Sequence, residues 1–295
     1  MEKKSVKRRY KDTLFRWIFG RTNEQSKRWR LELYNALNNS NYKNPDELEL
    51  TTIENVIYIS MKNDLSFLID SKMTLYEQQS TYNPNMPLRG FLYFSQLYEK
   101  WIVKENLDLY GHSLIKIPTP QYVVFYNGER KLDDITKFRL SDAFIIPDNS
   151  RDFEWTATFI NINEGHNDSI NKKCKPLYDY NRFVSRVKKN LQNGMDNNEA
   201  ISDAVDWAIN ENLLEGFFKI QKAEAMKMIL TEFDPELYER NRKREAYEEG
   251  REDQTIEAAK NFYKNGVSVE LISKSLNISV EQVKELVKDI VPESV

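Results

Sequence analysis

The fold of this chain is decided by residues 63–79, which read Asn-Asp-Leu-Ser-Phe-Leu-Ile-Asp-Ser-Lys-Met-Thr-Leu-Tyr-Glu-Gln-Gln. Apolar and β-branched residues stand on both sides of a polar Asp70-Ser71-Lys72 break. This pattern is typical of two short antiparallel strands joined by a tight turn. A two-residue turn at Asp70 and Ser71 pairs Ile69 with Lys72, so the stretch predicts a β-hairpin.

The pairing of this hairpin decides which side chains share a face. Side chains alternate along a strand, and opposed residues of an antiparallel pair lie on the same face. The expected turn therefore pairs Asp64 with Glu77, and Gln79 points the same way two residues later. A turn one residue longer or shorter would exchange the faces and separate the two carboxylates. The opposite face is expected to meet the core through three apolar side chains, those of Leu65, Phe67 and Ile69.

The composition is that of a folded protein without extracellular or membrane features. The chain has 295 residues, enough for roughly two domains, and 40% of them are hydrophobic although 30% are charged. Its single cysteine, Cys174, excludes an internal disulfide and a thiolate zinc site, and His112 and His166 are too far apart to suggest a ligand pair. No apolar run reaches the ~18 residues of a membrane span, and Arg16 interrupts the apolar N-terminal stretch. We therefore expect no membrane partner, no signal peptide and a cytoplasmic location.

The net charge of −3 conceals an uneven distribution. Residues 1–30 carry eleven Lys or Arg and three acids, which leaves about −11 for the rest of the chain. A basic arm on an acidic body suggests a polyanion as the partner of the arm. A solvated, frayed terminus is the alternative explanation. Our candidate contacts to the DNA backbone are Lys7, Arg8, Arg9 and Lys11.

The first half of the chain predicts mixed α/β structure. Apolar residues recur at helical spacing over residues 11–37 around a break at Gly20, and Thr22 or Asn23 can cap the second helix. Residues 56–61 predict a strand before the hairpin, and residues 88–107 a helix that packs on the sheet. Arg89 lies in the first turn of that helix. Further strands are expected at residues 122–126, before an Asn127-Gly128 turn signal, and at residues 138–146 and 155–162.

Beyond Asn167 the pattern is helical. Glutamate, arginine and lysine dominate residues 236–252, which predict an exposed helix that projects from the body or pairs with another chain. Two short amphipathic helices follow, with Ser268 and Ser279 as caps. This helical hairpin is poorly basic, so we favour protein binding or self-association over DNA reading. The expected helices are residues 178–191, 198–210, 213–231, 235–262, 269–276 and 280–287.

These patterns divide the chain into three parts. Residues 1–167 are expected to form an α/β domain with the basic N-terminal arm. Residues 168–265 form a helical region with a long charged helix, and residues 266–295 form the C-terminal helical hairpin.

The two expected hairpin carboxylates suit a divalent cation. Hard ions such as Mg²⁺ take carboxylate, carbonyl and water oxygens and work well beside phosphate. An ion held by Asp64 and Glu77 can activate water for attack on a phosphodiester and neutralise developing charge. The sequence contains no Gly-x-x-x-x-Gly-Lys phosphate loop, no Gly-x-Ser-x-Gly elbow and no zinc-binding pair of histidines. Acids on strands are nevertheless common, so the spacing alone does not establish catalysis.

Asp64, the hairpin and Glu77-Gln78-Gln79 resemble the core of the PD-(D/E)XK nuclease superfamily, in a variant where Gln79 stands in place of the usual lysine. More of the chain is similar to one branch, the recombination-promoting nuclease (Rpn) and transposase-like family. The shared features include Lys11-Asp12, Phe19-Gly20, residues 33–37, Asn63-Asp64, Arg89, Asn163-Glu164-Gly165-His166-Asn167 and a charged helical tail.

This resemblance implies a restriction-endonuclease-like core, mixed α/β, followed by an all-helical C-terminal region. It also implies DNA hydrolysis dependent on Mg²⁺ or Mn²⁺, with Asp64 and Glu77 as ligands and the Gln78 carbonyl as a backbone ligand. Gln79 can orient water or a phosphate oxygen, but its neutral amide supplies no charge and no base. Asn63 replaces the eponymous proline of the superfamily.

Two auxiliary residues, Glu32 and Arg89, each have two alternative explanations. Glu32 is either the acid that some relatives place on the first core helix or an ordinary surface acid. Arg89 either forms a salt bridge with a site carboxylate or contacts phosphate.

Two functions follow from these observations. The first is a metal-dependent DNA endonuclease in recombination or mobile-element biology, favoured by Asp64, Glu77 and the basic arm. The second is a catalytically weak or inactive protein of the nuclease fold that binds DNA or protein as a regulatory module. Gln79 and the acidic body favour the second function.

Overall fold

The computed structural model describes residues 14–51, 65–69, 71–148, 150, 152–232, 235–288 and 290. The chain divides into two compact units, Met1–Pro235 and Glu236–Val295. The first contains a β-sheet with helices on both faces, and the second is helical. Mixed α/β structure followed by helices is therefore confirmed, while the three-part division stays a prediction.

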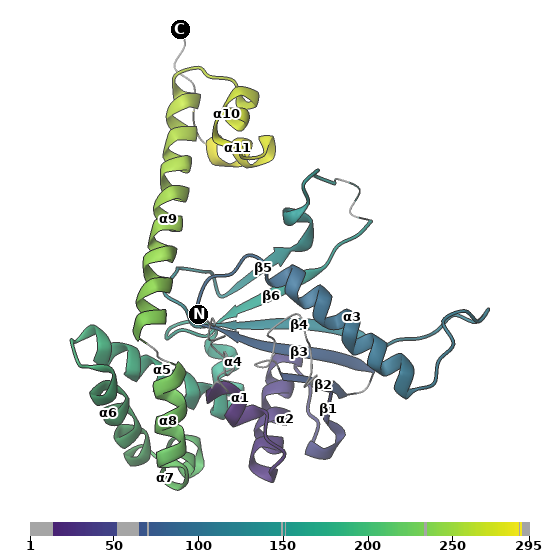
Figure 1. Cartoon of the computed structure of the whole chain (residues 1–295), viewed down its shortest axis with the longest axis vertical. Coiled ribbons are helices and arrows are strands. Elements are labelled where there is room, and N and C mark those ends of the chain that lie inside the picture. The colour runs from purple at the N-terminus through teal and green to yellow at the C-terminus, as the bar shows by residue number, and fades with distance from the viewer. Residues whose placement is uncertain are drawn as a thin grey trace, which may run out of the picture. The chain divides into compact units, whose positions relative to one another are not determined.

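A six-stranded mixed sheet is the centre of the first unit (Figure 1), with the order β1-β2-β3-β4-β6-β5. Strands β1 to β3 are antiparallel neighbours, β3, β4 and β6 run parallel, and β5 pairs antiparallel with β6. The carboxyl ends of β3, β4 and β6 therefore meet at one edge. The strands are β1 (Glu49–Leu50), β2 (Leu65–Ile69), β3 (Lys72–Gln79), β4 (Thr119–Tyr126), β5 (Ile135–Arg139) and β6 (Thr156–Asn161).

The hairpin between β2 and β3 has the register expected from its sequence. Ile69 pairs with Lys72 and Leu65 pairs with Tyr76. Ser71 adopts a φ of 60°, which the tight turn requires. This part of the prediction is confirmed. The strand expected at residues 56–61 lies outside the described residues.

The hairpin is buried on both faces. Leu65, Phe67 and Ile69 join the larger core with helices α1 (Leu14–Phe19) and α2 (Glu24–Asn38), as expected. Met73 and Leu75 point to the other face, where they pack under helix α3 (Met86–Lys104). Because side chains alternate along β3, Glu77 and Gln79 lie on this second face. The carboxylate of Glu77 thus faces a helix.

The first two helices form around the expected break at Gly20. Asn23 caps α2 by accepting a hydrogen bond from the Ser26 backbone N–H at 2.8 Å. Arg30, 1% exposed, reaches back from α2 and donates to the Phe19 carbonyl at 2.8 Å. Burial lowers the pKa of Arg30 to about 10. Arg30 satisfies a carbonyl at the end of α1 that has no partner within its own helix.

Helix α3 and strands β4 and β6 occur close to their expected positions, but the strand expected at residues 138–146 is wrong over most of its length. Strand β5 ends at Arg139, and Leu140–Ala143 form a 3₁₀ turn. The Glu154 carboxylate accepts hydrogen bonds from the Leu140 and Ser141 backbone N–H groups at 3.1 and 3.3 Å. The Leu140 N–H also donates to the Trp155 backbone carbonyl at 2.8 Å, so the distinct contribution of Glu154 is to accept from Ser141, where the backbone ladder has ended.

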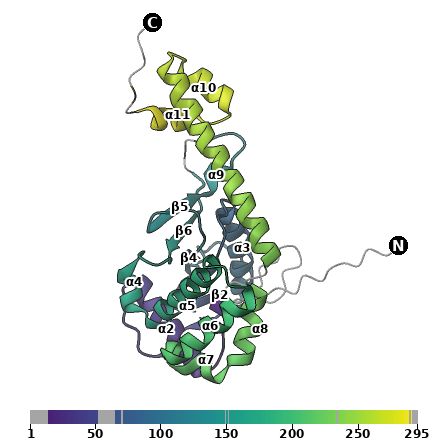
Figure 2. The same ribbon diagram turned by 90° about the vertical axis from the view of Figure 1, so that its left-hand side faces the viewer.

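In the described part of the first unit, five further α-helices follow the sheet, and those from α5 to α8 lie beside one another (Figure 2). They share the larger core with α1, α2 and one face of the sheet. Cys174 precedes α5, and burial raises the pKa of its thiol. These helices are α4 (Asp168–Lys173), α5 (Lys175–Gln192), α6 (Asn197–Asn210), α7 (Phe217–Ile220) and α8 (Lys222–Glu232).

The helical stretch expected at residues 213–231 is helical over most of its length but is interrupted near its start. Leu214 and Glu215 adopt φ of 52°, and Gly216 adopts 81°, so a 3₁₀ turn at Leu213–Gly216 precedes α7 and α8. The Asp179 carboxylate, 2% exposed, accepts a hydrogen bond from the Leu214 backbone N–H at 2.9 Å. This buried acceptor on α5 stabilises the turn.

The second unit consists of α9 (Pro235–Lys264), α10 (Val269–Leu276) and α11 (Val280–Val287), close to the expected positions. Ala259, Ile272, Val283 and Val287 form its small core. Ser268 and Ser279 cap the two short helices as expected. Among the described residues of both units, no helix combines the length and apolar character needed to cross a bilayer.

Candidate active site around Glu77

The structure describes only part of the site expected from the sequence. Asp64 lies outside the described residues, and so do the expected DNA contacts Lys7, Arg8, Arg9 and Lys11. Their roles stay predictions. The structure describes the other five expected site residues, Glu77, Gln78, Gln79, Arg89 and Glu32. Of these, Glu77, Gln79 and Arg89 lie together.

Glu77 is the centre of a buried polar cluster on the face covered by α3. Its side chain is 2% exposed. The Arg89 guanidinium forms a salt bridge with one carboxylate oxygen, and Gln79 donates its amide N–H to the same oxygen at 2.7 Å. Tyr122 donates its hydroxyl to the second oxygen at 2.8 Å. Both oxygens of Glu77 therefore accept charge-assisted hydrogen bonds.

Strand order brings these groups together. Gln79 follows Glu77 by two residues on the same strand, so both side chains share a face. The parallel register pairs Glu77 with Val124, and Tyr122 lies two residues earlier on the same face of β4. Arg89 reaches the carboxylate from the first turns of α3. Tyr122 was missed in the sequence, because strand patterns do not reveal that β4 neighbours β3.

Gly90 allows Tyr122 to approach α3. A Cβ atom built on Gly90 would lie 2.3 Å from the Tyr122 ring. That separation is far below van der Waals contact, so a larger residue would force the ring or the helix to move. The absence of a side chain at Gly90 therefore helps to aim the tyrosine hydroxyl at Glu77.

The arrangement holds a carboxylate in a fixed orientation. An ionised acid is rarely buried without a partner, and Glu77 has a cation and two neutral donors. Of the two expectations for Arg89, the salt bridge is the one that the structure shows. A ligand that approaches Glu77 must share or replace the Arg89 contact. The cluster is a functional-site candidate because its carboxylate is oriented near the carboxyl ends of parallel strands, where ligands bind in α/β sheets.

Gln78 points to the opposite face of β3. It donates its amide N–H to the Asn127 side-chain oxygen at 2.8 Å. Lys188 of α5 donates to the Asn127 backbone carbonyl and, at 3.3 Å, to the Asn163 side chain. These residues form a second polar cluster at the carboxyl ends of the parallel strands. The Gln78 carbonyl as a ligand stays a prediction.

Glu32 has a different environment from Glu77. Its carboxylate accepts a hydrogen bond from the Lys175 backbone N–H at 2.6 Å, at the start of α5. Burial raises the pKa of Glu32, and the hydrogen bond from Lys175 partly opposes this. Helices α2 and α5 belong to the larger core, on the face of the sheet away from α3. The structure does not place Glu32 in the Glu77 cluster.

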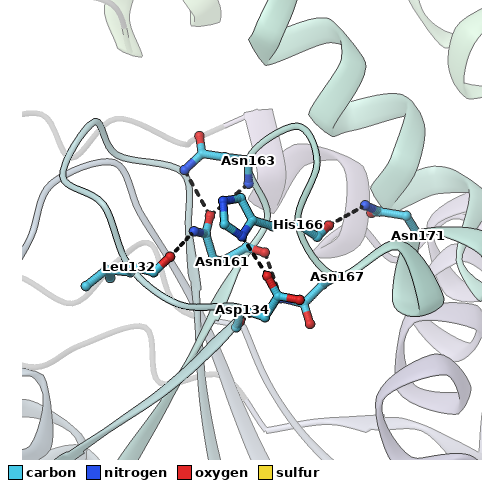
Figure 3. Close-up of polar contacts among 7 residues, drawn as sticks. All are labelled: Leu132, Asp134, Asn161, Asn163, His166, Asn167 and Asn171. Carbon is cyan, nitrogen blue, oxygen red and sulfur yellow. Dashed lines mark hydrogen bonds and ion pairs between the residues drawn. The ribbon is translucent and has the colours of Figure 1, made fainter.

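Residues 163–167, which follow β6, form a loop held by several hydrogen bonds (Figure 3). Asn167 donates to the backbone carbonyls of Asp134 and Asn161 at 2.6 and 2.8 Å. His166 Nδ1 lies 2.6 Å from the Asp134 carboxylate. Asn163 donates to the Asn161 side chain at 3.0 Å. These bonds fix the path of the chain between β6 and α4.

The metal-ligand atoms around Glu77 suit a divalent cation only if Asp64 supplies a second carboxylate. Within the described residues, no group of three or more His, Cys, Asp and Glu could hold a metal ion. Glu77 supplies carboxylate oxygens and Gln79 an amide, which are oxygen ligands of the type that Mg²⁺ prefers. A second carboxylate is needed, and the predicted one lies outside the described residues.

Comparison of the chain with models of protein families, with curated proteins and with solved structures gave no match.

Proposed function

We propose that this protein is a metal-dependent DNA endonuclease of the Rpn and transposase-like type, acting in recombination or mobile-element biology. The observation that carries the proposal is the buried Glu77 carboxylate, which is held by Arg89, Gln79 and Tyr122 at the end of β3. The observed register, which pairs Leu65 with Tyr76, supports the prediction that Asp64 faces Glu77. The reaction class, DNA hydrolysis, is proposed from the resemblance of residues 63–79 to the nuclease core.

The proposed roles follow from the contacts of each side chain. Asp64 and Glu77, with the Gln78 carbonyl, would hold Mg²⁺ or Mn²⁺, which neutralises charge developing on a phosphodiester. Tyr122 keeps Glu77 oriented by occupying one of its oxygens. Gln79 lies beside the other oxygen and can orient water or a phosphate oxygen through its amide. DNA is the proposed partner, and the basic arm supplies non-specific contacts to its backbone.

One observation favours the second function, a nuclease fold that binds without useful turnover. Arg89 and Gln79 both occupy the same oxygen of Glu77, so that oxygen is already saturated with donors. A cation would have to compete with a guanidinium for it. In addition, the neutral amide of Gln79 cannot stabilise a developing charge as an ammonium group does.

Cleavage of supercoiled plasmid with Mg²⁺ or Mn²⁺ tests the proposal. Wild type is expected to nick or linearise the plasmid, whereas Asp64→Ala and Glu77→Ala lose at least tenfold in rate. Glu99→Ala removes an exposed acid from α3 and serves as the matched control. If the Asp64 and Glu77 variants cut like wild type, the assigned site is wrong.

Electrophoretic mobility shifts separate the two functions. Wild type that cuts no DNA under any metal condition but still retards it would support the binding function. Wild type that neither cuts nor binds DNA would refute both functions as stated for DNA.

A further inference from the structure

A hollow lies on the opposite face of the sheet from Glu77. It has a volume of about 760 Å³ and lies between the loop after β6 and helices α5 and α6. We propose that this hollow binds a nucleotide unit, with its phosphate on the basic side chains of α5 and its base beside Trp207. The inference does not depend on nuclease activity at Glu77.

The hollow lies at the carboxyl ends of parallel strands. Asn163, at its wall, follows β6, and Lys188 links that residue to the end of β4 at Asn127. Loops at the carboxyl edge of parallel strands are the usual place for ligands in α/β sheets, because the chain there is free to vary while the strands fix its ends. The volume is within the range of small-molecule sites.

The loop wall of the hollow is held in place before any ligand arrives. Asn161 and Asn167, which are 3% and 9% exposed, fix the loop through the hydrogen bonds drawn in Figure 3. Gly165 adopts a φ of 85°, a conformation that favours glycine, and it lines the hollow. A preformed wall lowers the entropic cost of binding.

Basic side chains recur along one face of α5. Arg182, Arg186 and Lys189 follow each other at intervals of four and three residues, so they lie on one side of the helix. With Lys188, they give the hollow four basic side chains against two acidic ones, Glu164 and Asp168. Cations arranged along a helix suit a phosphate group.

Two of these cations are oriented by acids just outside the hollow. Arg182 lies 3.1 Å from Glu211, and Arg186 lies 2.8 Å from Asp203. A guanidinium has five N–H donors, so each arginine retains donors for a ligand. Lys189 is exposed, and within the described part of the chain it has no ion-pair partner. A phosphate can therefore bind Lys189 without displacing an existing ion pair.

Trp207 lies under two of these cations, so that indole and guanidinium groups together form the platform on which a base can stack. The Arg182 guanidinium carbon is 5.1 Å from the Trp207 ring centre and 5.7 Å from that of Tyr178. Arg186 is 5.7 Å from the same Trp207 ring. Nucleobases stack on aromatic rings and on guanidinium planes. Phosphate-binding cations beside such a platform favour a nucleotide over a free phosphate ion.

The nucleotide unit has two sources, a free mononucleotide or a segment of a single strand. Binding is measured without divalent metal, in EDTA, by fluorescence anisotropy of a fluorescein-labelled 12-nucleotide single-stranded DNA. Unlabelled adenosine monophosphate is then added as competitor. Displacement by the mononucleotide identifies a site for free nucleotides, whereas displacement by unlabelled oligonucleotide alone identifies a strand-binding site.

Substitutions in the hollow decide whether it is the site. Trp207→Leu is expected to weaken binding by roughly 5- to 150-fold, the range for loss of one stacked base. Lys189→Gln is expected to weaken binding and to reduce the slope of log K against log salt by about 0.7, the value of one phosphate contact to a single strand. Trp207→Phe keeps an aromatic ring and should retain most of the affinity.

Lys100→Gln is the matched control, since Lys100 is an exposed lysine on α3, on the other face of the sheet. Lys189 is exposed, so its replacement does not threaten the fold. The proposal is overturned if wild type does not bind the labelled oligonucleotide. It is also overturned if Lys189→Gln binds as wild type does, or if Lys100→Gln weakens binding as much as Lys189→Gln.

Discussion

Replacement of Arg89 by glutamine is expected to destabilise the first unit by about 3 kcal/mol at pH 7. Glu77 is 2% exposed, so without Arg89 the buried carboxylate loses its cationic partner. Removal of one partner from a buried pair costs about 3–5 kcal/mol. The Arg89 side chain is 28% exposed, and Gln79 and Tyr122 still donate to the carboxylate, which places the cost at the lower end.

Urea unfolding followed by tryptophan fluorescence measures this cost. All five tryptophans of the chain lie in the first unit, so the signal reports that unit. The measurement is repeated in the background of Glu77→Gln, which removes the charge and keeps the shape. In that background Arg89→Gln should cost less than about 1 kcal/mol, which gives a coupling energy of about 2 kcal/mol between the two side chains.

Arg28→Gln is the matched control for this cycle. Arg28 lies 3.0 Å from Glu215, but the two side chains are 57% and 48% exposed. Exposed pairs contribute about 0–1 kcal/mol, so this variant should unfold close to wild type. The reasoning fails if Arg89→Gln costs as little as Arg28→Gln, or if its cost is the same with and without the Glu77 charge.

Three further outcomes are expected. Gly90→Ala should lower stability in urea by about 1–3 kcal/mol, because the new methyl group overlaps a tyrosine ring. Side-chain hydrogen bonds lower the pKa of Asp203 below its usual 3.8, and the bond from Asn190 has a larger effect than that from Arg186. The Asp203 carboxylate therefore stabilises the fold above that value and loses this effect as pH falls from 3.8 through its folded pKa. Asp203→Asn should melt earlier than wild type at pH 7 and approach it as the pH falls below 3.8. Burial raises the pKa of Glu32, so its ionised form costs stability as pH rises through the folded pKa. Glu32→Gln should be at least as stable as wild type at pH 7 and lose this advantage below about pH 4 in thermal melts.

Local pattern was sufficient to predict the hairpin. The Asp70-Ser71-Lys72 break and the alternation on either side gave the pairing of Ile69 with Lys72 that the structure shows. The capping serines of the last two helices were also predictable from the sequence, because a cap depends on residues three positions apart. Features of this kind depend on neighbours in the sequence.

Features that depend on distant partners were not predictable. Strand β5 ends where the Glu154 carboxylate meets the 3₁₀ turn after it, and the helix expected at residues 213–231 is interrupted where Asp179 holds Leu214. At the site, Glu77 and Gln79 were found by alternation within one strand. Tyr122 was not found, because its place depends on β4 lying parallel beside β3, a long-range pairing without a local signal.

The deep burial of Cys174 has a practical consequence for labelling experiments. Only the thiolate reacts readily with maleimides and other alkylating reagents, and burial raises the pKa of this thiol, so it stays protonated at neutral pH. Because Cys174 is the single cysteine of the chain, a cysteine introduced at an exposed position would be modified without background. Spectroscopic probes can thus be attached at chosen positions while the native thiol remains in the core.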